Sequence, residues 1–105
     1  MGSVKKINSD IYNETIASGL VVIDFYADWC GPCNMMAPVF EETAKDYEGR
    51  VVFAKMNTDE NQDIAMRNGI MSIPTMMFFK DGKLFDRVVG YIDKGTLCRK
   101  VDALL

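Results

Sequence analysis

The sequence predicts an α/β protein, a three-layer α/β/α sandwich in which four helices flank a mixed five-stranded sheet. Apolar runs rich in β-branched residues alternate along the chain with segments of helical periodicity, which is typical of α/β folds. One run, LVVIDFY at 20–26, is apolar on both faces, as expected in the middle of a sheet covered by helices. The right-handed crossover rule then places helices on both faces of the sheet.

The N-terminal part of the chain is expected to begin with a short strand at 4–7. Ser9 can cap a helix that runs over 9–18, and Gly19 can end it in a left-handed conformation. The buried strand at 20–26 follows directly.

The middle of the chain is expected to contain a long helix from Cys30 to Glu48, with a kink at Pro38 and Gly49 at its end. A β-branched strand follows at 51–57, and then a short helix at 61–69. The buried face of the long helix is expected to contain Met36, Phe40, Thr43, Ala44 and Tyr47.

The C-terminal part is expected to form a hairpin and a last helix. Strands at 73–79 and 84–89 are joined by KDGK at 80–83, a turn signal that makes them antiparallel. The amphipathic segment 94–105 forms the last helix, and Cys98 lies beside its apolar face as a partly buried structural thiol. Met36, Met76 and Met77 are expected to fill the core.

Composition excludes several classes of protein. The chain has 105 residues, a formal charge of −3 and no repeat or linker, so we expect one domain over 1–105 that binds no nucleic acid. No run reaches the roughly 18 apolar residues that span a membrane, and MGSVKKINSD has no signal-peptide core. Three cysteines are not a secreted disulfide framework, so we expect a reducing, cytoplasmic location.

The segment WCGPC at 29–33 carries the predicted chemistry. If Cys30 lies at the start of a helix, the free N–H groups and the helix dipole stabilise its thiolate. Pro32 fits this placement, because the first helical turn has no use for its missing N–H. Cys33 lies one turn further inside and is more buried. The pair is therefore expected to be unequal, with Cys30 as nucleophile and Cys33 as resolving thiol.

The sequence gives less support to three alternative roles of the cysteines. A structural disulfide would close a very small loop and stabilise the fold little. A zinc site needs about four ligands, and the chain has no histidine and only one further cysteine, so we expect no metal. The lack of histidine also removes the usual base of a cysteine hydrolase. Redox chemistry is the favoured interpretation.

The sequence resembles the thioredoxin family over nearly its whole length. The resemblance is carried by VIDFYADWCGPC, by Lys55 in the next strand, and by the segments IPT, KDGK and VGY. It implies the thioredoxin fold and a general protein-disulfide reductase that cycles between a Cys30/Cys33 dithiol and disulfide, without a bound cofactor. The implied partners are a thioredoxin reductase and disulfide-containing target proteins, and we expect a monomer.

Asp24 is a carboxylate in a strand with two apolar faces, so its pKa should be raised. Two interpretations remain open. Asp24 could form a structural ion pair with Lys55 in a neighbouring strand, or it could be the general base that takes the proton from Cys33. The resemblance favours the general-base role of Asp24, with the charge of Lys55 adjusting the pKa of Asp24.

The resemblance also implies a substrate-binding surface. It makes the Ile73–Pro74 peptide bond cis and places this loop opposite the cysteines, where the Ile73 backbone pairs with an extended substrate segment. Asn34 stands where many relatives have Lys or Arg, which leaves the choice of reductase open. The expected surface consists of Trp29, Gly31, Pro32, Ile73, Pro74 and Gly90.

Two other functions remain open. A disulfide oxidase or isomerase would need a markedly higher reduction potential, and the Gly-Pro dipeptide between the cysteines offers no imidazole to stabilise the dithiol form. A binding module could use the same fold and apolar surface without redox turnover. The sequence favours the reductase over both.

Overall fold

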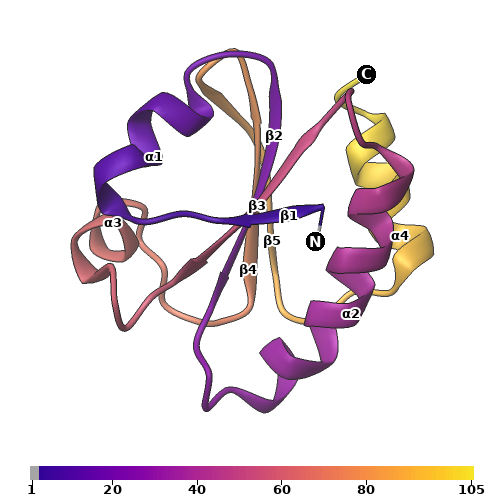
Figure 1. Cartoon of the computed structure of the whole chain (residues 1–105). Coiled ribbons are helices and arrows are strands. Elements are labelled where there is room, and N and C mark those ends of the chain that lie inside the picture. Colours follow the sequence, from indigo (N-terminus) through magenta and orange to yellow (C-terminus); the bar gives the residue numbers. More distant parts are fainter. Residues whose placement is uncertain (1–2) are drawn as a thin grey trace.

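Strands and helices follow one another in the order that the sequence predicts (Figure 1). A computed structural model describes residues 3–105 of the chain. The elements are β1 (Val4–Lys6), α1 (Ser9–Ile16), β2 (Leu20–Tyr26), α2 (Gly31–Asp46), β3 (Val52–Asn57), α3 (Gln62–Arg67), β4 (Thr75–Lys80), β5 (Lys83–Val89) and α4 (Lys94–Asp102).

The five strands form one mixed sheet in the order β1-β3-β2-β4-β5. β1 and β2 run parallel to β3, whereas β4 is antiparallel to both of its neighbours, β2 and β5. The predicted mixed sheet and its antiparallel hairpin are therefore confirmed. β2 is the central strand, and Asp24 lies opposite Lys55 on β3 and Met76 on β4.

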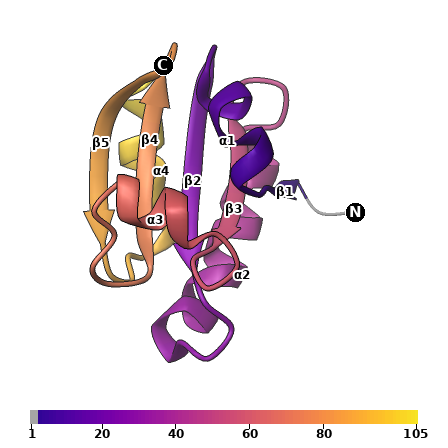
Figure 2. The same ribbon diagram turned by 90° about the vertical axis from the view of Figure 1, so that its left-hand side faces the viewer.

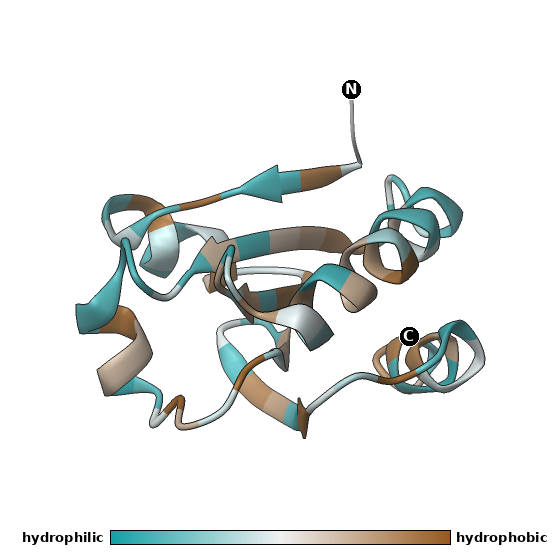
Figure 3. Ribbon diagram, turned by 90° about the horizontal axis from the view of Figure 1, so that it is seen from below, coloured by the Kyte–Doolittle hydropathy of each residue, from teal (hydrophilic) through white to brown (hydrophobic). Residues whose placement is uncertain are grey.

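The helices cover both faces of the sheet, α1 and α3 on one side and α2 and α4 on the other (Figures 1 and 2). Alternate residues of β2 point into the two cores, because successive strand side chains face opposite ways. Val22 packs in the core beneath α2 and α4, and Ile23 packs in the core beneath α1 and α3. Figure 3 shows the hydrophobic strands between the two helix layers. The predicted core methionines, Met36, Met76 and Met77, are buried.

The cap of α1 differs from the prediction. Asn8 caps the helix, and its side-chain oxygen accepts hydrogen bonds from the N–H groups of Asp10 (3.0 Å) and Ile11 (3.3 Å). Ser9 is the first helical residue, and its hydroxyl donates to Asp63 at 2.6 Å instead. Asparagine and serine cap helices about equally well, so the tertiary contact of Ser9 decides which of the two is the cap.

The helices also end earlier than predicted. α1, α2 and α3 end two residues before the predicted positions and α4 three residues before, because a capping turn follows the last helical residue. Gly19, Gly49 and Gly69 then take positive φ angles of 76°, 82° and 63°, as predicted for helix stops. The start of α2 is also shifted by one residue, since Cys30 is its cap and Gly31 its first residue.

Candidate active site

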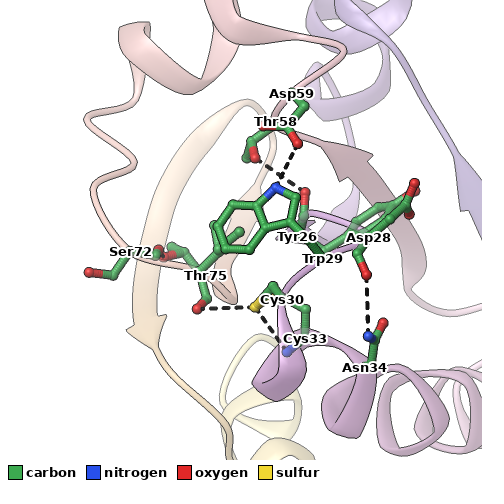
Figure 4. Close-up of a disulfide and its surroundings, with 11 residues drawn as sticks. Tyr26, Asp28, Trp29, Cys30, Cys33, Asn34, Thr58, Asp59, Ser72 and Thr75 are labelled. Carbon is green, nitrogen blue, oxygen red and sulfur yellow. Dashed lines mark hydrogen bonds between the residues drawn. A yellow bond between two sulfur atoms is a disulfide. The ribbon is translucent and has the colours of Figure 1, made fainter.

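The two cysteines of WCGPC lie at the start of α2, as predicted, and form a disulfide (Figure 4). Cys30 is the N-cap residue, and its Sγ accepts a hydrogen bond from the Cys33 N–H at 3.2 Å. The Cα atoms of the pair are 5.2 Å apart. Pro32 lies in the first turn, where the helix needs no N–H from it. The helix start therefore holds Cys30 where a negative sulfur is stabilised.

The two sulfurs differ less in exposure than the sequence predicts. Cys30 is 5% exposed and Cys33 is 2% exposed, so both are buried. They differ in what they face. The Sγ of Cys30 lies 3.7 Å from the carbonyl oxygen of Ile73, in the loop before β4, whereas Cys33 lines a pocket that it shares with Asp24. The inequality of the pair therefore depends on orientation and on the cap position.

Trp29 covers the site from the other side. Its side chain is 73% exposed, and its indole Nε1–H donates to a carboxylate oxygen of Asp59 at 2.8 Å (Figure 4). The turn that carries Asp59 is tied to β2, because the Thr58 N–H donates to the Tyr26 carbonyl at 2.8 Å. Sequence reasoning missed Asp59, since it lies 30 residues from Trp29 and no local pattern marks it.

The loop that enters β4 lies beside the cysteines. The Ile73–Pro74 bond is cis, as predicted, and Ile73 packs against the cluster that contains both cysteines. The Gly90 N–H donates to the Pro74 carbonyl at 2.7 Å, which holds the end of β5 against this loop. Ile73, Pro74 and Gly90 are therefore brought together at the end of the molecule where Cys30 lies.

Asp24 is buried beneath the site. It is 4% exposed, and its Oδ1 has no hydrogen-bond partner among the described residues. Burial raises the pKa of the Asp24 carboxyl from 3.8 to about 7, and the positive charge of Lys55 opposes this rise. The direct ion pair considered from the sequence is absent among the ion pairs of residues 3–105. Lys55 instead places its Nζ 5.6 Å from the centre of the Tyr26 ring.

A pocket of about 340 Å³ joins Asp24 to the cysteine pair. It lies between α2 and the β1-β3-β2 side of the sheet, and Asp24, Cys33 and Lys55 all line it. A carboxylate, the inner sulfur of the pair and a lysine thus share one cavity. The other lining residues are Val4, Lys6, Tyr26, Asp28, Asn34, Ala37, Phe40 and Glu41.

Residues 3–105 offer no cluster of three or more His, Cys, Asp or Glu side chains that could hold a metal ion. Cys98 is a free, partly buried thiol that packs against the core beneath α2 and α4. None of the helices in the described part of the chain is long and apolar enough to cross a membrane. The cysteine pair is therefore the chemically reactive feature that the geometry singles out.

Comparisons with known proteins agree with this geometry. The family profile described as thioredoxin matches residues 3–103. The thioredoxin of Chlorobaculum thiosulfatiphilum is 51% identical over 78% of this chain and 76% of its own length. The thioredoxin of Staphylococcus haemolyticus is 44% identical over 95% and 96%. The crystal structure of Malassezia sympodialis thioredoxin superposes with a TM-score of 0.86 at 40% identity, covering 98% of this chain and 91% of that one.

Proposed function

The chain belongs to the thioredoxin family, and we propose that it is a general protein-disulfide reductase in which Asp24 and a surface around Cys30 have defined roles. As a member of the family it is a thiol-disulfide oxidoreductase. The observation that carries the proposal is the position of Cys30, which caps α2 and lies below the exposed ring of Trp29.

The reaction proceeds in two exchange steps. The Cys30 thiolate attacks one sulfur of a target disulfide, forming a mixed disulfide and releasing the other target sulfur as a thiolate, which takes up a proton. The Cys33 thiolate then attacks the Cys30 sulfur of that bond, because it is held within the same helical turn. The target leaves with two thiols, and the protein keeps the Cys30–Cys33 disulfide.

Asp24 is the base that accepts the Cys33 proton in the second step. Its carboxylate shares the 340 Å³ pocket with Cys33, and a pKa of about 7 lets it both take up and release a proton near neutral pH. Lys55 lines the same pocket, and its positive charge lowers the free-energy cost of ionising Asp24. Lys55 is therefore a positioning and tuning residue.

The target docks as an extended segment on the surface formed by Trp29, Gly31, Pro32, Ile73 and Gly90, beneath which the buried Pro74 holds the loop. Supporting this, Trp29, Gly31 and Pro32 are exposed, and no hydrogen bond within residues 3–105 uses the Ile73 N–H. A free backbone donor beside the reactive sulfur suits a target that pairs like an added strand.

A thioredoxin reductase returns the disulfide to the dithiol. The reducing direction is supported by the Gly-Pro dipeptide between the cysteines, which offers no imidazole to stabilise the dithiol form. We further propose that the protein acts as a monomer in the cytoplasm, where cysteines are kept reduced.

Insulin reduction by dithiothreitol tests the proposal. A catalytic amount of the protein should accelerate the precipitation of the reduced insulin chains, because Cys30 exchanges with a protein disulfide faster than the small thiol does. The Cys30→Ser variant should give no acceleration. A wild-type protein that fails to accelerate the reaction would instead point to a binding module that uses the fold without redox turnover.

A further inference from the structure

Three methionines are exposed on a protein whose other described methionines are fully buried. Met71 is 92% exposed, Met66 80% and Met35 61%, whereas Met36, Met56, Met76 and Met77 are at most 1% exposed. Met71 has the largest exposed fraction among the exposed large hydrophobic side chains. Because it packs against so little of the protein, the Met71 side chain contributes little to the stability of the fold and is accessible to a partner and to solvent.

The position of Met71 ties it to the reactive sulfur. Met71 lies two residues before Ile73, whose carbonyl oxygen is 3.7 Å from Cys30 Sγ. Figure 4 shows the neighbouring Ser72 on the loop beside the cysteines. Consecutive Cα atoms are about 3.8 Å apart, so Met71 lies within about 8 Å of Ile73 along the chain. A target segment that pairs with Ile73 and continues along this loop would come within reach of the exposed Met71 side chain.

The chemistry of methionine gives this position two properties. Its flexible, polarisable thioether adapts to apolar partners of many shapes, as a reductase of varied proteins requires. A peroxide can also transfer one oxygen atom to the sulfur, which converts methionine into a polar sulfoxide. A target that covers the sulfoxide would remove water from a strong acceptor without replacing the lost hydrogen bonds.

We propose that Met71 is an oxidation site whose sulfoxide weakens the docking of protein disulfides. This inference rests on the proposed function. In the reaction, the Met71 sulfur loses two electrons and gains the oxygen, and hydrogen peroxide is reduced to water. The Cys30–Cys33 disulfide form has no thiolate for peroxide to attack, so Met71 can be oxidised while the cysteine pair keeps its chemistry.

Peptide mass mapping of the disulfide form tests the first half of the proposal. The Cys98 thiol is blocked with iodoacetamide, and the protein is then exposed to hydrogen peroxide for increasing times. Met71 should gain one oxygen well before the buried Met36 and Met76, which serve as internal controls. Oxidation of Met71 no faster than that of these buried residues would overturn the proposal.

Kinetics of the treated protein test the second half. The KM for insulin should rise about fivefold, the order of effect expected from losing part of the apolar contact of one methionine side chain. The rate with 5,5′-dithiobis(2-nitrobenzoic acid), which has no peptide backbone to pair with Ile73, should stay unchanged. Peroxide should leave the KM of Met71→Leu unchanged, because leucine cannot form a sulfoxide. In the matched control Met66→Leu, on α3, peroxide should raise the KM for insulin as it does in the wild type.

Two results would contradict the inference in different ways. A rise in KM that persists in Met71→Leu, or no rise in the wild type, overturns the role of Met71 and leaves the reductase function intact. An untreated protein that reduces neither substrate overturns the proposed function, and the role of Met71 with it.

Discussion

Replacing Asp24 by Asn should stabilise the protein while slowing its chemistry. Asn keeps the shape of the side chain but cannot ionise, so the substitution removes the negative charge. Asp24 is 4% exposed and its Oδ1 has no hydrogen-bond partner among the described residues, which is an expensive environment for a carboxylate. Asp28 lines the same pocket but is exposed, so Asp28→Asn is the matched control.

The magnitude follows from the pKa of Asp24. The rise from 3.8 to about 7 corresponds to about 4 kcal/mol of unfolding free energy, at about 1.4 kcal/mol for each tenfold change in proton affinity. This value is the cost of keeping the carboxylate charged inside the fold. Partial relaxation around the charge reduces it, so we expect Asp24→Asn to gain about 2–4 kcal/mol at pH 8.

The stabilisation of Asp24→Asn relative to the wild type should increase as pH rises. The folded protein binds the Asp24 proton more tightly than the unfolded chain does, so the charge costs nothing below the unfolded pKa. The cost grows as pH rises from about 4 and is complete above about 7. Asp24→Asn should therefore be about as stable as the wild type at pH 4 and most strongly stabilised at pH 8. Asp28→Asn should show no such trend.

Guanidinium chloride melts of the disulfide forms between pH 4 and pH 8 measure this difference. The disulfide removes the titration of Cys30 and Cys33, and the chain has no histidine that could titrate in the same interval. Lys55→Gln should move the midpoint of the trend to higher pH, because the Lys55 charge opposes the rise in the pKa of Asp24. A stabilisation of Asp24→Asn that is equal at pH 4 and pH 8 would refute the reasoning, as would a loss of stability at pH 8.

Three further predictions concern single contacts. In the reduced protein, brief iodoacetamide treatment followed by mass mapping should find Cys30 alkylated faster than Cys33, since only Cys30 combines the cap position with a sulfur beside the Ile73 loop. Asp59→Ala should free the indole of Trp29, changing its fluorescence and raising the KM for insulin by about threefold, because the 2.8 Å hydrogen bond is lost. Tyr47→Phe should lower the unfolding free energy by about 1–2 kcal/mol in urea melts, because it removes a 2.6 Å hydrogen bond from the residue that caps the end of α2 to Asp102 on α4.

Local patterns predicted the framework of the molecule well. The apolar strand around Asp24 is buried on both faces, as its composition predicts, and WCGPC opens a helix with Cys30 at its cap. These features depend on residues that are close in the sequence. Helix ends were less well predicted, because Asn8 and Ser9 are equally good caps and a distant contact with Asp63 decides between them.

Contacts between distant segments could not be predicted from patterns. Asp59 binds Trp29 across 30 residues, and only the folded sheet brings the turn after β3 next to WCGPC. Lys55 was expected in the strand beside Asp24, and the register places it there, but side-chain packing directs its Nζ toward Tyr26. The shared pocket is likewise a property of the packed structure, since β1, β2, β3 and α2 all line it.

Capture of a target by single-cysteine variants tests most directly the claim that Cys30 attacks and Cys33 resolves. Cys33→Ser and Cys30→Ser, both in a Cys98→Ser background, are reduced, incubated with insulin and separated on non-reducing gels. Cys33→Ser should accumulate a mixed disulfide through Cys30, because the thiol that resolves it is missing. Cys30→Ser should capture far less, because Cys33 is only 2% exposed and lies one turn inside α2. Equal capture by the two variants would contradict the assigned roles, and capture by neither would contradict the redox function.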